Sequence, residues 1–160
     1  MPCVRSSPLP PHASLAAYSS KGAYTDCYSV RIDRSVSLAE FMTAFYINRI
    51  FKLERWLLAS ILRLPSSDEE AKSLARGERE HFSAWEVETR REDQAILAAG
   101  RTRSWLMVAP SGKCTTLFFG SAIVPRRQGG LGWQFTTLLG FHKLYSRILL
   151  RAAARHLTSR

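Results

Sequence analysis

The stretch 102–124, TRSWLMVAPSGKCTTLFFGSAIV, decides the fold that we expect for this chain. It holds two runs rich in β-branched and aromatic residues, 102–109 and 114–124, and each run predicts a strand. Between them stands Pro110-Ser111-Gly112-Lys113, whose proline and glycine are typical of a tight turn. The stretch therefore predicts an antiparallel hairpin, and Gly120 within its second strand suggests a bulge.

Further strands are expected before this hairpin. In segment 81–89, Trp85 and Val87 alternate with acidic residues, which is typical of a half-buried antiparallel strand. The apolar segment 95–99 predicts the next strand, and the alternating segment 24–32 predicts a first strand near the N-terminus. The sheet is therefore expected to be antiparallel and mostly a meander.

The region between the first strand and the meander is expected to be helical. The tetrapeptides 37–40 (SLAE) and 67–70 (SDEE) are capping boxes, in which two side chains satisfy free backbone N–H groups at a helix start. The apolar pattern after the first box fits one long helix or two, about 37–47 and 50–63. The second box begins a short helix that Gly77 ends.

The last predicted element is a long amphipathic helix over 133–156. Its polar side carries four bases spaced four residues apart: Lys143, Arg147, Arg151 and Arg155. Such a stripe attracts anionic lipid or nucleic acid, although no nucleic-acid recognition motif accompanies it. The other interpretation is a solvated face that pairs with the acidic residues of segment 68–93.

This element order predicts an α+β fold with a curved antiparallel sheet wrapped on the C-terminal helix, and two or three shorter helices after the first strand. The order over residues 24–157 resembles the helix-grip fold of the START-like (Bet v 1-like) superfamily of polyketide cyclases and lipid-transfer proteins. Segments 51–55, 101–106 and 140–145 are similar to segments of uncharacterised bacterial proteins. The resemblance implies an apolar cavity between sheet and helix, in a fold that hosts carriers, cyclases, hydrolase-like enzymes and regulators.

Length and composition predict a single domain. The chain has 160 residues, and its proline- and serine-rich start suggests a mobile tail over 1–22 before a domain over 23–160. The three cysteines are scattered without a CxxC motif, so we expect free thiols in a reducing cytoplasm, no metal site and no cofactor. Five charges within 41–64 exclude that apolar-rich stretch as a membrane span.

The charge is distributed unevenly along the chain. The formal net charge is +10, and residues 1–93 hold all 13 acidic residues together with 13 bases. Residues 94–160 hold ten bases and no acid, so the whole excess lies in that part. Since the same part would line the cavity, its charge could select an anionic ligand.

Strand alternation puts Arg103, Trp105 and Met107 on one face of the predicted sheet. If Trp105 faces the helix, Arg103 does too, and a buried guanidinium needs a partner. That partner is either a ligand carboxylate or phosphate, or one of the acidic residues Glu54 and Glu86.

His142 and Tyr145 lie three residues apart on the C-terminal helix and therefore share a face. They could bind a ligand by hydrogen bonds, transfer protons together with Glu54, or be satisfied core residues.

Three functions remain open. The first is a binding protein for a small apolar or amphipathic, and in one version anionic, ligand. The second is a cyclase- or dehydratase-type enzyme that uses the same cavity, and the third is a basic adaptor for anionic lipid or nucleic acid. The sequence leaves the oligomeric state and the question of catalysis undecided. The residues expected to form the ligand site are Trp85, Arg103, Trp105, Met107, Phe119, His142 and Tyr145.

Overall fold

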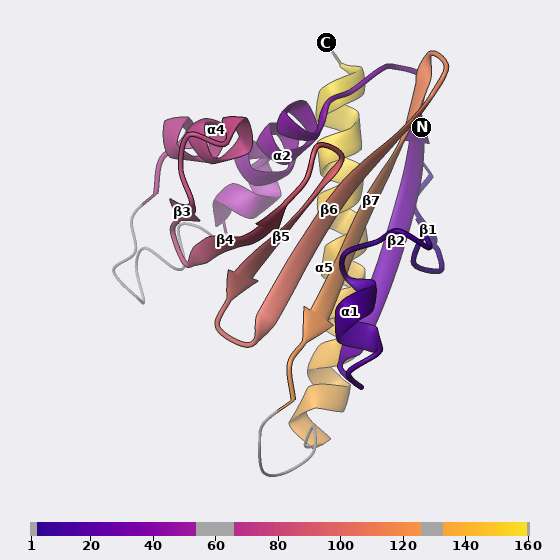
Figure 1. The fold of residues 1–160 in the computed structure, drawn as a ribbon, viewed down its shortest axis with the longest axis vertical. Coiled ribbons are helices and arrows are strands. Elements are labelled where there is room, and N and C mark those ends of the chain that lie inside the picture. Colours follow the sequence, from indigo (N-terminus) through magenta and orange to yellow (C-terminus); the bar gives the residue numbers. More distant parts are fainter. Residues whose placement is uncertain (1–2, 54–65, 126–132, 160) are drawn as a thin grey trace.

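The computed structural model describes residues 3–53, 66–125 and 133–159, with side chains from His142 onward in the last range (Figure 1). In chain order the elements are β1 (Arg5–Ser6), α1 (Ala16–Ser19), β2 (Tyr24–Ile32), α2 (Leu38–Ile47), α4 (Asp68–Arg76), β3 (His81–Phe82), β4 (Trp85–Arg90), β5 (Gln94–Ala99), β6 (Thr102–Ser111), β7 (Cys114–Ile123) and α5 (Trp133–Thr158). The chain is therefore α+β, as predicted.

The strands form one antiparallel sheet in the order β1-β2-β7-β6-β5-β4-β3. β3 to β7 are a meander, and β2 pairs along its whole length with β7, Tyr24 opposite Ile123 and Ile32 opposite Thr115. Gly120 does not mark a bulge, because β7 keeps an unbroken register with β6 around it. A Cβ at this position would lie 2.6 Å from the Asp26 carbonyl oxygen, so the close approach of β2 requires glycine there.

Helices cover one face of the sheet. α2 contacts β6, and α5 runs along β2 and β7 with α2 at its side (Figure 1). α4 begins and ends as predicted, with the Ser67–Glu70 capping box and Gly77 in the left-handed conformation. Within the described residues, no helix combines the length and the apolar character that a membrane span requires.

The helical region after β2 is interrupted at Asn48, which decides between the two expected arrangements. α2 ends at Ile47, and a new helical turn covers 49–53. The Asn48 side chain accepts hydrogen bonds from the N–H groups of Ile50 and Phe51 and donates one to the Phe45 carbonyl oxygen. One side chain thus caps both helix ends, which explains the break. The rest of the second predicted helix lies outside the described residues.

The segment that was expected to be a mobile tail is folded onto the other face of the sheet. α1 and the preceding chain lie in front of the sheet in Figure 1. Ala13 and Leu15 are buried there, in a second apolar cluster with Ile96, Trp105 and Met107. Because both faces are covered, the sheet is a central layer with a small core in front and a large core behind it.

The large core between sheet and helices is filled by side chains. Ring centroids of Phe45 and Phe119 lie 4.6 Å apart, and those of Tyr46 and Phe51 lie 4.9 Å apart. Trp85 packs 5.0 Å from Phe51 in the same cluster. Aromatic residues therefore form the packed core where the sequence analysis expected a ligand cavity.

Candidate ligand-binding groove

A surface groove of about 630 Å³ lies beside the sheet, where β2, α5 and the N-terminal segment meet. Its walls include residues 6–9 of the N-terminal segment, residues 24–28 of β2, and Lys143 and Arg147 of α5. We call it the β2–α5 groove. Its volume is within the usual range for small-molecule sites.

The α5 wall of the groove is basic. Lys143 and Arg147 are both exposed and lie one helical turn apart. The Arg147 guanidinium lies over the Tyr28 ring, 5.4 Å from its centroid. This cation–π contact holds the guanidinium beside the groove with its N–H groups available to an anion.

Asp26 lies at the inner end of the groove and is almost completely buried, with 7% of its side chain exposed. Oδ1 accepts a hydrogen bond from the Ser121 backbone N–H at 2.9 Å, and Oδ2 accepts one from the Tyr24 hydroxyl at 3.3 Å. Burial raises the pKa of the Asp26 carboxyl, although the charge of His142 and these hydrogen bonds oppose the shift.

His142 of α5 lies beside the Asp26 carboxylate of β2. Its Nε2 lies 3.6 Å from Asp26 Oδ2, which is close enough for an ion pair when His142 is protonated. The same Nε2 is buried and makes no hydrogen bond to any described residue. The pair therefore joins β2 to α5, and His142 keeps unused hydrogen-bonding capacity at this position.

The tyrosines of the groove are neutral phenols. Burial raises the pKa of Tyr28 to about 12, with Asp26 adding to the shift and Arg147 opposing it. Burial also raises the pKa of Tyr24. Burial raises the pKa of the Cys27 thiol to about 12, so this thiol is not a nucleophile at neutral pH. The groove thus has a mixed lining, in which the hydroxyl groups of Ser6, Ser7, Ser19 and Thr25 stand beside aromatic and aliphatic surface and the cations of α5.

The predicted site residues do not form a single site. Trp85, Phe119 and Tyr145 belong to or pack against the large core behind the sheet. Only His142 and the bases Lys143 and Arg147 reach the groove or its inner end.

Arg103, Trp105 and Met107 share a face, as predicted, but this face is turned away from α2 and α5 and toward α1 and the chain before it. Trp105 Nε1 donates to Gln94 Oε1 at 2.9 Å beneath the N-terminal segment. Arg103 pairs with Glu88 and bonds the Tyr18 hydroxyl. The expectation of helix-facing side chains was wrong because the N-terminal segment buries this second face as well.

Glu88 was not among the expected acidic partners of Arg103, which were Glu54 and Glu86. Glu86 is exposed and lies 3.9 Å from His81, and Glu54 lies outside the described residues. Three acidic residues of α4 and the following turn pair with bases of their own region, Glu69 with Lys72, Glu70 with Arg79, and Glu78 with Arg76, whereas Asp68 pairs with Lys52 before α4.

Asp26, Tyr24 and Ser121 were missed by the sequence analysis. Asp26 shares the alternating side of Tyr28, Val30 and Ile32. The sequence signal that could have found Asp26 is a carboxylate on the inward side of a predicted strand, because a buried charge needs polar partners.

No family model, curated protein or solved structure matches the chain. Among the described residues, no three His, Cys, Asp or Glu side chains are grouped so as to hold a metal ion.

Proposed function

We propose that the protein binds a small amphipathic anion in the β2–α5 groove. The observation that carries the proposal is the Arg147 guanidinium beside the Tyr28 ring, with Lys143 one turn away on the same wall. A guanidinium binds a carboxylate or phosphate through two parallel hydrogen bonds, and Lys143 adds a second positive charge. The anionic group would therefore lie at the rim of the groove.

The apolar part of the ligand would lie against the inner walls. Pro8, Leu9 and the half-buried Tyr24 supply apolar surface there. Because Asp26 is buried and already accepts two hydrogen bonds, it would leave the anion free to approach the bases. This arrangement moves the expected ligand from the interior of the fold to the edge between β2 and α5.

We also propose that the chain is a helix-grip protein of the START-like kind. The support is a seven-stranded antiparallel sheet along a long C-terminal helix, with shorter helices between β2 and the meander. The resemblance implies a ligand cavity between sheet and C-terminal helix, whereas the proposed groove lies at the edge of that space, between β2, α5 and the N-terminal segment.

Calorimetry with decanoate tests the binding function. Arg147→Gln should weaken binding of decanoate about tenfold, as expected for loss of a hydrogen bond to a charged group. Arg151→Gln is the matched control, because it removes an exposed base one turn further along α5 that does not line the groove.

Decanol, which has the same chain without the charge, should bind both variants equally. Native mass spectrometry of the purified protein complements this test by detecting a co-purified small molecule. Equal losses in the two variants, or no binding of decanoate together with no co-purified molecule, would contradict the proposal.

A cyclase- or dehydratase-type enzyme is the second candidate, and the Asp26–His142 pair favours it. A buried carboxyl with a raised pKa beside an imidazole is suited to proton transfer. If this function is correct, wild-type protein should remove water from a co-purified molecule or close a ring in it, which changes its mass or its chromatographic retention, whereas Asp26→Asn protein should leave it unchanged.

A further inference from the structure

Helix α5 has an exposed face that combines aliphatic and basic side chains. Leu144 is 56% exposed and Ile148 is 40% exposed, which makes them two of the three large hydrophobic residues of the described chain that are open to water. Arg151 and Arg155 are exposed on the same helix. At about 100° per residue, these four side chains fall within an arc of about 60°. We call them the α5 exposed face.

The opposite side of α5 holds the helix on the protein. Leu149, Leu150, Ala153 and Leu157 are buried in the large core. The helix therefore has a buried apolar stripe that packs on the sheet and helices, and a separate pair of apolar side chains that faces solvent. Burial of the first stripe stabilises the fold, whereas the exposed pair Leu144 and Ile148 adds nothing to the core.

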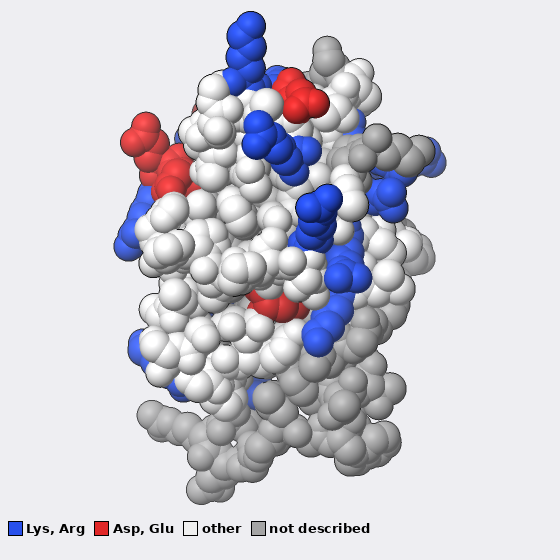
Figure 2. All heavy atoms as spheres, turned by 90° about the vertical axis from the view of Figure 1, so that its right-hand side faces the viewer, with Lys and Arg blue, Asp and Glu red and all other residues white. Residues whose placement is uncertain are grey.

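The electrostatic surroundings of the α5 exposed face are positive. Residues 94–160 contain no acidic residue, and Arg147 adds its charge at one border of the face. Figure 2 shows Lys and Arg side chains gathered in a column on this side of the molecule, with a red patch against the lower part of the column and another near its upper end. Such a surface attracts anionic partners over about a Debye length.

A lipid bilayer fits this face better than a nucleic acid does. Both offer phosphates to the bases, but only the bilayer interface accepts aliphatic side chains next to those phosphates. On nucleic acid, Leu144 and Ile148 would remain in water or face a charged backbone. The presence of these two residues in the basic arc is the observation that separates the two partners.

We propose that the α5 exposed face docks on an anionic lipid bilayer, with Leu144 and Ile148 entering the interface and Arg151 and Arg155 contacting lipid phosphates. The helix would lie parallel to the surface while its other side stays packed on the protein. This docking uses residues outside the β2–α5 groove and goes beyond the proposed ligand-binding function.

Co-sedimentation with vesicles tests the proposal. Full-length protein should bind vesicles of phosphatidylcholine mixed with phosphatidylglycerol, bind pure phosphatidylcholine vesicles much more weakly, and lose affinity as salt rises. Arg151→Gln should weaken binding about fivefold, the expected effect of one base near an anionic surface. The double variant Leu144→Ser, Ile148→Ser should lose about tenfold or more at physiological salt although its charge is unchanged.

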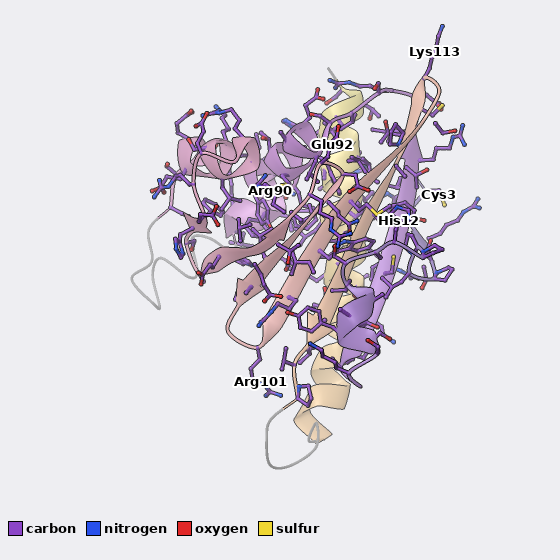
Figure 3. The ribbon with its side chains drawn as sticks, viewed as in Figure 1. Cys3, His12, Arg90, Glu92, Arg101 and Lys113 are labelled. Carbon is purple, nitrogen blue, oxygen red and sulfur yellow. The ribbon has the colours of Figure 1, made fainter. Side chains whose placement is uncertain are left out.

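Lys113→Gln is the matched charge control. Lys113 is exposed at the tip of the β6–β7 hairpin and points away from the body of the molecule (Figure 3). It should bind vesicles as wild type does. Thermal unfolding of each variant checks that the fold is intact, which is expected because every substituted side chain is exposed.

Three results would overturn the docking proposal. The first is no binding to the anionic vesicles at low salt, and the second is an equal loss in Lys113→Gln and Arg151→Gln. The third is tighter binding to duplex DNA than to vesicles with no effect of the double serine variant, which would identify nucleic acid as the partner. Decanoate binding by the Arg151→Gln protein is measured in a separate calorimetric experiment. A failure of the docking proposal can therefore be distinguished from a failure of the ligand-binding function.

Discussion

Substitution of Gln94 should release the N-terminal segment from the sheet. Gln94 is 1% exposed, and its Oε1 accepts hydrogen bonds from Trp105 Nε1 at 2.9 Å and from the Ser14 N–H at 2.7 Å. Its Nε2 donates to the His12 carbonyl oxygen at 3.1 Å. One side chain of β5 thus joins the segment before α1 to the tryptophan of β6.

The variant Gln94→Met keeps the length of the side chain and removes all three hydrogen bonds. The buried Trp105 N–H left without an acceptor should cost about 2 kcal/mol and each of the two partly buried bonds about 0.5 kcal/mol, so the free energy of unfolding should fall by about 3 kcal/mol. Most of this arises at Trp105, since its indole N–H is fully buried and water cannot replace the lost acceptor. The bonds to Ser14 and His12 are only partly buried, so water replaces part of their contribution.

Two assays measure the effect. Urea unfolding followed by tryptophan fluorescence gives the change in stability, and limited chymotrypsin digestion gives the accessibility of Tyr18 in α1. The control is Glu92→Met, which introduces the same side chain at an exposed position just before β5. The reasoning is refuted if Gln94→Met costs less than about 1 kcal/mol, or if cleavage at Tyr18 is no faster than in the control.

Three further predictions concern the sheet, the helix break and the groove. Gly120→Ala should lower the free energy of unfolding by about 3 kcal/mol. The alanine Cβ would lie 2.6 Å from the Asp26 carbonyl oxygen, whereas ordinary van der Waals contact begins at 3.4 Å. A free energy of urea unfolding within about 0.5 kcal/mol of wild type would contradict this prediction. Asn48→Ala should cost about 1–2 kcal/mol in the same assay, since it removes the cap shared by α2 and the next helical turn, and an unchanged midpoint would argue against that role. Burial raises the pKa of Asp26 above its ordinary value of 3.8, so the folded state holds this proton more tightly than the unfolded state, and stability should fall as pH rises from about 4 through the raised pKa. Asp26→Asn should lack this fall, and parallel stability–pH curves for the two proteins would count against a buried, ionisable Asp26.

Local signals in the sequence were sufficient for most element boundaries. The alternation of 24–32 matched β2 at both ends, and the two capping boxes marked the starts of α2 and α4. Gly77 ended α4 in the left-handed conformation, as its place in the sequence indicated. These signals work because a cap or an alternating strand depends on residues within a few positions of each other.

The candidate groove depends on contacts that no local pattern reports. Asp26 meets His142 because β2 pairs with the last strand of the meander and α5 then returns along β2. Alternation separates the two faces of β6 but does not say which one meets the helices. The covering of the second face by Ala13 and Leu15 therefore reversed the expected direction of Trp105.

By itself, the sequence determined the α+β class, the order of the elements from β2 onward except that the single strand expected over 81–89 is two, β3 and β4, and the concentration of positive charge in residues 94–160. Only the tertiary structure decided that the aromatic residues fill the core, that the N-terminal segment belongs to the fold, and that Arg147 stands over Tyr28 at a groove. The physical reason is that secondary structure follows from hydrogen bonds and side-chain periodicity over short distances. The identity of a buried face is set by whichever distant segment removes it from water.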